Sequence, residues 1–377
     1  MINNIYLNID IDLYKLDNFN WYYKDLFIWN NYSFSFRRRI VFFGTKKNDP
    51  DFKVVLKKIR VNNNYEHILK EIYFLVCCKN LKQFIQIIDI FLTDDKNFIF
   101  LIFKEEGTSL QNLIEYDNIE DFDYKKIDGF IKHIIFQIVY ALRILHNAKL
   151  IHNDIKPSNI LINSIGTTKI CDFGSVDKPG NTRYSTIYYS SPDALLQKES
   201  SEKDDMWSVG VIMIELYKRI SNFFNFNSFS TELNKLSKNE LQLKSILSNY
   251  TITINNKKYD IKEKNDFDFI KNEIIKNNNY DNFEAKLNLD GIPDSEAIEL
   301  INNLLEINPE KRFSSQQALD SKYLSEFKKE IKDIDKIEKI YRKEDYIILL
   351  EKVSNLDKFV KNVELIKQKF LGQVLFD

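Results

Sequence analysis

The hydrophobic pattern of the chain changes its period near residue 104. Before this point, short β-branched and aromatic runs lie at residues 26–34, 39–43, 52–59, 84–92 and 98–103. These runs predict a five-stranded antiparallel sheet, and apolar residues at helical spacing in 65–78 predict one helix among them. After residue 104 helical spacing prevails, most clearly at 124–147. The pattern predicts an α+β fold of two lobes: a small antiparallel β-sheet lobe with one main helix, then a larger, mainly α-helical lobe.

The length of the chain also favours several parts, because 377 residues exceed the usual size of one hydrophobic core. We expect an N-terminal extension at 1–25, the small lobe at 26–104, the large lobe at 105–325 and a C-terminal helical appendage at 326–377. A polar insertion is expected at about 221–290. Within it, residues 250–261 alternate like a hairpin that turns at Asn255 and Asn256.

Charge and composition exclude several classes of partner. Lysine and arginine (54) nearly balance aspartate and glutamate (55), so net charge gives no drive toward nucleic acid or an anionic membrane. Residues 1–12 carry acids where a secretory signal carries bases, and no apolar run approaches the roughly 20 residues of a membrane span. The three cysteines support neither a disulfide framework nor a zinc site. We expect an intracellular monomer, cytoplasmic or nuclear, that binds neither nucleic acid nor membrane.

The segment most informative about chemistry is 150–162, which reads Leu-Ile-His-Asn-Asp-Ile-Lys-Pro-Ser-Asn-Ile-Leu-Ile. Phosphoryl transfer needs a carboxylate that orients the attacking hydroxyl and accepts its proton, and a side-chain oxygen that holds a metal ion. Asp154 and Asn159 supply these two groups, and Lys156 places a positive charge beside the transferring phosphate. The alternative is a polar loop whose residues carry no chemistry.

A second polar segment follows at 169–174, which reads Lys-Ile-Cys-Asp-Phe-Gly and ends a short strand. Here Asp172 is a candidate metal ligand and Phe173 a candidate core anchor. Gly174 is the flexible point at which the chain turns. Together the two segments favour a phosphotransferase over a chance cluster of polar residues.

These segments resemble the eukaryotic protein kinase family, whose His-Arg-Asp and Asp-Phe-Gly motifs correspond to residues 152–154 and 172–174. Residues 54–57, Val-Val-Leu-Lys, resemble the family's third-strand lysine motif, and Glu71 resembles the partner of that lysine on the next helix. An ordinary surface ion pair is the alternative for Lys57 and Glu71, and Lys58 is the alternative lysine.

Three further segments resemble motifs of the same family, in the same order: 188–193, 205–210 and 308–312. The resemblance implies a structural ion pair between Asp193 and Arg312, and implies that Asp205 braces the catalytic loop.

The resemblance also implies the bilobal kinase fold, ATP and Mg²⁺ as cofactors, and a protein substrate. It implies nucleotide contacts for Lys57, Glu71, Ile40, Val55, Phe103, Lys104, Glu106 and Ser109. Residues 54–60, 100–104 and the insertion are similar to the CMGC branch, which contains the cyclin-dependent, mitogen-activated and Clk-type kinases. Lys156 after the catalytic acid implies serine/threonine specificity.

The chain also departs from the family pattern. Residues 33–40 lack all three glycines of the phosphate-covering loop, and Arg38 does not allow the backbone to approach the phosphates closely unless the loop takes another path. Direct contact of Arg37 to Arg39 with phosphate is the alternative, although basic residues on a strand are more often only solvated. Asn153 replaces the arginine that binds a phosphorylated activation segment, and Asn181 occupies the approximate position of the phosphothreonine. Ser190 replaces the arginine of proline-directed relatives, so we do not infer that specificity. These changes favour constitutive activity or activation by a protein partner.

Three functions follow as hypotheses. The first is an active protein serine/threonine kinase, because all six polar residues of its machinery are present. The second is a pseudokinase that acts as a binding module, because the glycines are missing. The third is a kinase for a small molecule, which the segments at 188–193, 205–210 and 308–312 disfavour.

Overall fold

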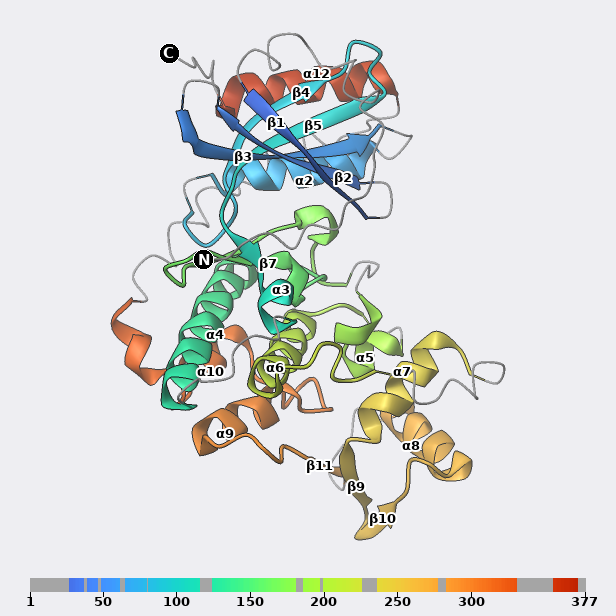
Figure 1. The fold of residues 1–377 in the computed structure, drawn as a ribbon. Coiled ribbons are helices and arrows are strands. Elements are labelled where there is room, and N and C mark those ends of the chain that lie inside the picture. Colours follow the sequence, from blue (N-terminus) through green and yellow to red (C-terminus); the bar gives the residue numbers. More distant parts are fainter. Residues whose placement is uncertain are drawn as a thin grey trace. The chain divides into compact units, whose positions relative to one another are not determined.

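The computed structural model describes residues 27–36, 39–46, 49–61, 65–79, 81–115, 124–180, 186–196, 199–225, 236–276, 283–330 and 355–371. The chain divides into two compact units: unit 1 comprises the described parts of Met1–Glu106 and Lys339–Asp377, and unit 2 those of Gly107–Glu338. Unit 1 is built on an antiparallel sheet and unit 2 is mainly helical (Figure 1). The predicted α+β fold is therefore confirmed. The expected N-terminal extension lies outside the described residues, and the bounds of the four expected parts of the chain stay predictions.

Five strands form the sheet of unit 1: β1 (Phe27–Phe36), β2 (Arg39–Lys46), β3 (Asp49–Arg60), β4 (Ile87–Leu92) and β5 (Phe98–Lys104). Their order is β1-β2-β3-β5-β4, and every neighbouring pair is antiparallel. Helix α2 (Tyr65–Cys77) follows β3 and buries one broad face, as its helical spacing predicts. Each predicted run before residue 104 thus overlaps a strand or this helix.

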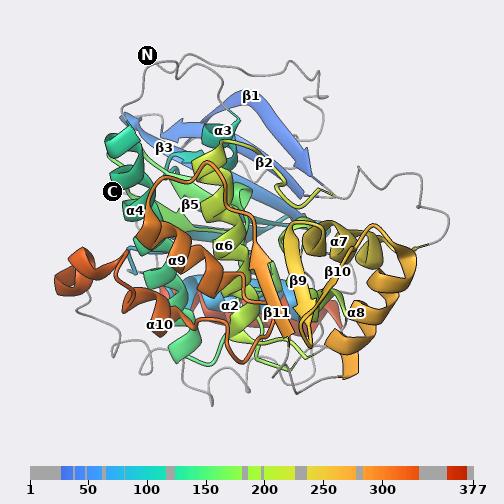
Figure 2. The ribbon, with the colours of Figure 1, turned by 90° about the horizontal axis from the view of Figure 1, so that it is seen from below.

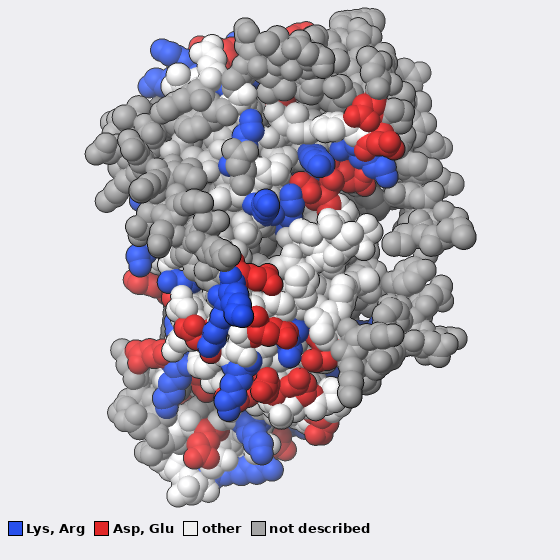
Figure 3. All heavy atoms as spheres, turned by 90° about the vertical axis from the view of Figure 1, so that its left-hand side faces the viewer, with Lys and Arg blue, Asp and Glu red and all other residues white. Residues whose placement is uncertain are grey.

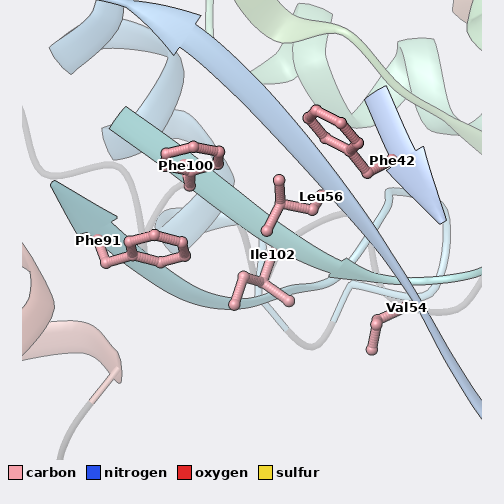
Figure 4. Close-up of a cluster of buried hydrophobic side chains, with 6 residues drawn as sticks. All are labelled: Phe42, Val54, Leu56, Phe91, Phe100 and Ile102. Atoms are coloured by element: carbon pink, nitrogen blue, oxygen red, sulfur yellow. The ribbon is translucent and has the colours of Figure 1, made fainter. Parts of the chain in front are cut away.

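A hydrophobic cluster occupies one face of this sheet (Figure 4). Its buried members come from β2, β3, β4 and β5: Phe42, Val54, Leu56, Phe91, Phe100 and Ile102. Leu56 lies opposite Ile102 across the β3–β5 ladder, and the rings of Phe91 and Phe100 stack at 4.7 Å. Because side chains alternate between the faces of a strand, the neighbours of Leu56 in β3 point to the other face.

The C-terminal part of the chain returns to unit 1. Helix α12 (Leu356–Ile366) begins at Asn355, whose side chain accepts a hydrogen bond from the backbone N–H of Lys358 at 3.0 Å. The helix packs on α2, where the ring of Phe359 lies 5.2 Å from that of Tyr65. A π-helical turn, η8 (Lys367–Leu371), follows, and Nζ of Lys367 lies 2.8 Å from Oδ1 of Asp89. Residues 331–354 and 372–377 of the expected appendage lie outside the described residues.

Two long helices form the centre of unit 2. Helix α4 (Tyr124–Asn147) packs against α6 (Glu202–Lys218), and α9 (Ser295–Leu304) packs on α6 from another side. The apolar spacing at 124–147 predicted α4. By length and composition α4 could cross a membrane, but 67% of its apolar window is buried inside the structure, as in the core helix of a folded domain.

Short elements around these helices complete the part of unit 2 that carries the polar motifs: β6 (Thr108–Ser109), α3 (Leu110–Ile114), η2 (Pro157–Asn159), β7 (Ile160–Ile162), β8 (Thr168–Ile170), η3 (Phe173–Ser175), η4 (Ile187–Tyr189), α5 (Pro192–Leu195), α10 (Ser315–Leu319) and η6 (Ser325–Glu330). The strands form a small sheet in the order β6-β7-β8. Strands β7 and β8 lie between Asp154 and Asp172 in the chain and pair with each other.

The expected insertion at 221–290 contains more structure than a hairpin (Figure 2). The predicted hairpin is present as β9 (Tyr250–Ile254) and β10 (Lys257–Tyr259), with left-handed backbone at Asn255 (φ 50°) and Asn256 (φ 63°). A third strand, β11 (Phe283–Leu287), pairs with β9, and helices α7 (Lys238–Leu247) and α8 (Lys264–Lys276) lie beside the sheet.

The surface mixes both signs of charge. On the face drawn in Figure 3, lysine and arginine side chains lie next to acidic ones, and the coloured residues form no large area of one sign. This agrees with the net charge of −1. The absence of a nucleic acid partner stays a prediction.

Candidate active site

Asp154 is surrounded by polar partners in the loop between α4 and η2. Its Oδ2 accepts hydrogen bonds from Nζ of Lys156 at 2.7 Å and from Nδ2 of Asn159 at 3.0 Å. Its Oδ1 accepts from the hydroxyl of Thr186 at 2.6 Å, and Lys156 also donates to that hydroxyl at 2.8 Å. The structure therefore brings together three of the residues that the sequence singled out, and adds Thr186.

Asp205 at the start of α6 holds the backbone of this loop. Its carboxylate accepts from the backbone N–H groups of His152 at 2.8 Å and Asn153 at 2.9 Å. Asn153 has left-handed backbone (φ 64°), which turns the chain sharply before Asp154. The brace that the resemblance implied for Asp205 is present.

His152 is fully buried and links the two polar segments. Its Nε2 donates to the backbone oxygen of Cys171 at 3.2 Å, and its Nδ1 accepts from the backbone N–H of Asp154 at 3.3 Å. Burial lowers the pKa of His152, although the charges of Asp205, Asp154 and Asp172 oppose this shift. The ring is therefore neutral near pH 7, as its one donor and one acceptor role require. It also packs edge-on against Phe173 at 5.5 Å.

The two candidate metal ligands are brought together by the β7–β8 pair. The backbone N–H of Cys171 donates to the backbone oxygen of Asn159 at 2.9 Å, which places Asp172 next to Asn159. Nδ2 of Asn159 donates to Asp154, so Oδ1 is the side-chain atom of Asn159 that a metal ion would bind. An amide oxygen and a carboxylate are ligands that Mg²⁺ prefers, and in phosphoryl transfer the metal is bound by such groups together with phosphate oxygens. The residues present fit a nucleotide-bound divalent cation.

Lys57 and Glu71 form an ion pair within unit 1, between β3 and α2. Their side chains are 12% and 5% exposed, so this is a partly buried pair rather than an ordinary surface contact. Lys58, the alternative lysine, points to the opposite face of the sheet, where its ammonium lies 3.9 Å from the ring centre of Phe98. The parity of the strand therefore selects Lys57.

The other expected nucleotide contacts are distributed over both units. In unit 1, Val55 lies opposite Phe103 across β3 and β5, and Lys104 ends β5. Ile40 lies opposite Lys58 in the β2–β3 ladder. Glu106 is the last residue of the first of the two chain segments that form unit 1. In unit 2, Ser109 caps α3 by accepting from the backbone N–H of Asn112 at 3.3 Å.

The segment that lacks the three glycines is the β1–β2 connection. Phe36 pairs with Arg39 at the end of the ladder, so the strands are joined by Arg37 and Arg38, which lie outside the described residues.

Comparison with known proteins agrees with this geometry. A sequence model of the protein kinase domain matches residues 41–324, which is most of the chain. The chain belongs to the protein kinase family. The mitogen-activated protein kinase sty1 of Schizosaccharomyces pombe is 32% identical over 287 residues, which cover 73% of this kinase and 74% of sty1. The mitogen-activated protein kinase hog-1 of Neurospora crassa is 29% identical over 288 residues, which cover 73% of this kinase and 72% of hog-1.

A third relative matches over a shorter stretch. The mitogen-activated protein kinase HOG1 of Scheffersomyces stipitis is 37% identical over 171 residues, which cover 43% of this kinase and 42% of HOG1. These likenesses place the kinase with the mitogen-activated kinases of the CMGC branch. It is an ATP-dependent protein serine/threonine kinase that uses a divalent metal ion and acts on protein substrates.

The activation segment of the kinase is held without the usual arginine. Nδ2 of Asn153 donates to the backbone oxygen of Ser175 at 3.0 Å, at the start of the segment. At its end, the hydroxyl of Ser190 donates to the backbone oxygen of Thr186 at 3.3 Å. Asn181 lies outside the described residues. The ends of the segment are thus fixed by neutral side chains, so neither of these contacts needs a phosphate.

The scaffold motifs of the kinase have the implied contacts. Nη2 of Arg312 lies 2.7 Å from Oδ1 of Asp193, and both side chains are buried. Burial would raise the pKa of Asp193, but the charge and hydrogen bond of Arg312 outweigh burial and lower it. The shorter aspartate therefore still reaches the arginine.

Thr186 is the site residue that sequence reasoning did not identify. Its backbone N–H and its hydroxyl both donate to Oδ1 of Asp154. The only signal in the sequence was a hydroxyl residue just ahead of the motif at 188–193. Without a known loop path, nothing joins that residue to Asp154.

Proposed function

We propose that this kinase transfers the γ-phosphate of ATP to a serine or threonine hydroxyl with Mg²⁺ as its metal ion, and that Asp154 receives the proton of that hydroxyl. The observation that carries the proposal is the set of contacts around Asp154. Both of its oxygens accept hydrogen bonds, from Lys156, Asn159 and Thr186, so the carboxylate is oriented as an acceptor.

Each side chain then has one part in the step. The substrate oxygen bonds to the γ-phosphorus while the bond from that phosphorus to the β–γ bridging oxygen breaks, and ADP leaves. Asp154 accepts the hydroxyl proton, and Lys156 stabilises the charge on the phosphoryl oxygens. When bound, Mg²⁺ supplies neutralising charge at the phosphates, and Asn159 and Asp172 are the residues that would hold it.

The proposal also covers the substrate, the cellular location and the oligomeric state of the kinase. Near-zero net charge and the absence of a basic patch on the face drawn in Figure 3 support a protein substrate without nucleic acid. Three cysteines without disulfide spacing support an intracellular, cytoplasmic or nuclear location. We also propose a monomer that either is constitutively active or is activated by a protein partner. Light scattering on the purified protein tests the monomer.

The experiment that tests the activity compares wild type with Asp154→Asn. Each protein is incubated with labelled ATP, Mg²⁺ and a generic protein substrate, and phosphoamino acids are separated after hydrolysis. We expect label on serine or threonine with wild type, and at least about 100-fold less with Asp154→Asn, because the proton acceptor is lost. Chelation of the metal should abolish incorporation.

A binding experiment separates an active kinase from a pseudokinase. Mg²⁺-ATP at about 100 times its dissociation constant stabilises a protein by about 2.7 kcal/mol, which raises its unfolding temperature. A shift in both proteins with label only for wild type supports the proposal. Equal incorporation by wild type and Asp154→Asn would remove Asp154 from the mechanism. No shift and no label would favour a binding module, as the missing glycines allow.

A further inference from the structure

Three buried side chains connect α10 to the loop that carries Asp154. Ser315 is the first residue of α10, and its Oγ lies 3.0 Å from Nδ1 of His146 in the last turn of α4. Nε2 of the same ring lies 3.0 Å from Oδ2 of Asp205. Ser315 and Asp205 are 1% exposed and His146 is 2% exposed, so water does not compete for these contacts. Neither Ser315 nor His146 has a part in the transfer described above.

The carboxylate of Asp205 sets the direction of these hydrogen bonds. It accepts from the backbone N–H groups of His152 and Asn153, so it acts as an acceptor toward His146 as well. Nε2 of His146 must therefore carry a hydrogen. When the ring is uncharged, its Nδ1 accepts a hydrogen bond, and the hydroxyl of Ser315 is the group that donates to it.

We propose that Ser315 is a positioning residue for phosphoryl transfer, an inference that deepens the proposed function and rests on it. By donating to Nδ1, Ser315 holds the ring of His146 in the tautomer and orientation that Asp205 requires. Asp205 in turn holds the two backbone N–H groups directly before Asp154. A hydroxyl at the start of α10 thus contributes to the position of the carboxylate that receives the proton of the substrate.

The attachment of α10 to α4 does not depend on this hydroxyl. The next residue, Gln316, accepts a hydrogen bond from Nε of Arg143 at 2.9 Å. Ser314 caps α10 by accepting from the backbone N–H of Gln317 at 3.3 Å. Both contacts remain when Ser315 loses its hydroxyl. A substitution of Ser315 therefore tests the ring of His146, whereas a substitution of Gln316 tests the packing of the helix.

The kinetic test compares Ser315→Ala with Gln316→Ala in the full chain, with Mg²⁺-ATP and a generic protein substrate. We expect kcat of Ser315→Ala to fall about fivefold, the equivalent of one neutral hydrogen bond, with KM for ATP unchanged. Gln316→Ala should lower the unfolding temperature and leave kcat unchanged. Ser315→Thr keeps the hydroxyl and should restore most of kcat.

A spectroscopic test reports on the ring itself and does not need activity. The chain has four histidines, so ¹⁵N-labelled histidine gives four pairs of ring signals. The variants His67→Gln, His133→Gln and His152→Gln assign the other three pairs, which leaves that of His146. We expect a protonated Nε2 and an unprotonated Nδ1 in wild type, and a changed Nδ1 signal or a second tautomer in Ser315→Ala.

Both readouts must change together for the proposal to hold. Unchanged ring signals, or an unchanged kcat with altered ring signals, would overturn it. A fall in kcat without a change in the ring would also overturn it, because the effect would then reach Asp154 by another route. A wild-type protein without kinase activity would refute the proposed function instead, and the ring signals would still show whether Ser315 fixes His146.

Discussion

At the scale of single residues, side chains of the same type differ in the groups that they contact. Lys57 and Lys58 are neighbours in β3, yet Lys57 pairs with Glu71 and Lys58 lies over the ring of Phe98. Glu215 in α6 is buried, and no lysine or arginine among the described residues forms an ion pair with it; it accepts a hydrogen bond from the hydroxyl of Tyr189 at 3.0 Å. Such differences in partners predict different responses to substitution.

Substitution of Lys57 should lower the activity strongly, whereas substitution of Lys58 should change it little. Lys57→Met removes the cation that orients the nucleotide phosphates, so we expect kcat to fall by about 100-fold or more. Lys58→Met keeps an apolar side chain over Phe98, so kcat should stay within a few-fold of wild type. Steady-state kinetics measure both, and circular dichroism confirms the fold. Equal losses in the two variants would contradict the assignment of Lys57.

Glu215 should make stability depend on pH. Burial raises the pKa of Glu215 to about 7 from an ordinary 4.5, and the nearby Glu115 adds to the shift. The folded protein thus holds this proton to higher pH than the unfolded chain, and the free energy of unfolding decreases as pH rises from about 4.5 to about 7. Glu215→Gln removes this loss. From pH 4 to pH 8 its free energy of unfolding should therefore rise by roughly 3 kcal/mol relative to that of wild type.

Urea unfolding of wild type and Glu215→Gln at both pH values measures this gain. The difference between the two pH values cancels any loss of hydrogen bonding in Glu215→Gln that does not depend on pH. A difference in the free energy of unfolding that does not vary with pH would show that the pKa of Glu215 is not raised in the folded protein.

The site residues that lie in short motifs could be identified from the sequence. Residues that reach the site only through the folding of distant segments could not. Alternation along β3 selects Lys57 over Lys58, because period 2 fixes which face a side chain takes. Thr186 and Ser315 could not be found in this way. Each reaches its partner, Asp154 or His146, only through the packing of distant elements.

At the scale of elements, α6 shows how closely the helices of unit 2 approach. Gly210 faces α9 and the turn after it, and a Cβ built at Gly210 would lie 2.7 Å from Cγ of Leu305 and 3.0 Å from Cβ of Leu304. Gly129 in α4 has no heavy atom within 4 Å of its built Cβ. A side chain at Gly210 would therefore clash with α9 and the turn after it, whereas Gly129 has room for one.

The same substitution at these two glycines should change stability in opposite directions. Gly210→Ala forces α6 and α9 apart, and overpacking of this kind costs about 1–3 kcal/mol. Gly129→Ala removes backbone freedom from the unfolded chain at a spacious helical position and should stabilise by about 0.5–1 kcal/mol. Thermal and urea unfolding compare the two variants. Destabilisation by both would indicate that helix packing is not the cause at Gly210.

Periodicity predicted the elements with a strong pattern and missed those with a weak one. The hairpin of β9 and β10 was predicted because Asn255 and Asn256 suit a tight turn with left-handed backbone. Strand β11 was missed, since it is a short edge strand in which two exposed charged residues interrupt a run that ends in one buried residue, Leu287. Helices α7 and α8 were missed because their polar surfaces dilute the apolar spacing.

At the scale of the whole molecule, unit 1 is assembled from two distant parts of the chain. Helix α12 covers α2, the helix that carries Glu71, and Phe359 of α12 is fully buried there. The adjoining turn η8 lies against β4, where Lys367 donates to the backbone oxygen of Ile90 at 3.0 Å. The edge strand β4 is therefore covered rather than open to another chain.

Removal of the buried ring on α12 should weaken unit 1. Phe359→Ala deletes a fully buried aromatic side chain, which costs about 3–5 kcal/mol. Leu365 on the same helix is 46% exposed, so Leu365→Ala should cost about 0.5 kcal/mol or less. Calorimetry of the two variants measures the difference. Similar unfolding temperatures would mean that α12 contributes little to unit 1.

The divided origin of unit 1 has a consequence during synthesis. The ribosome produces all of Gly107–Glu338 between the strands of the sheet and the helix that covers α2. Unit 2 is continuous in sequence and can collapse as soon as it emerges, whereas the small sheet must wait with one side of α2 uncovered. A chaperone that shields exposed apolar surface would therefore find its binding site on the earlier-made part of the nascent chain.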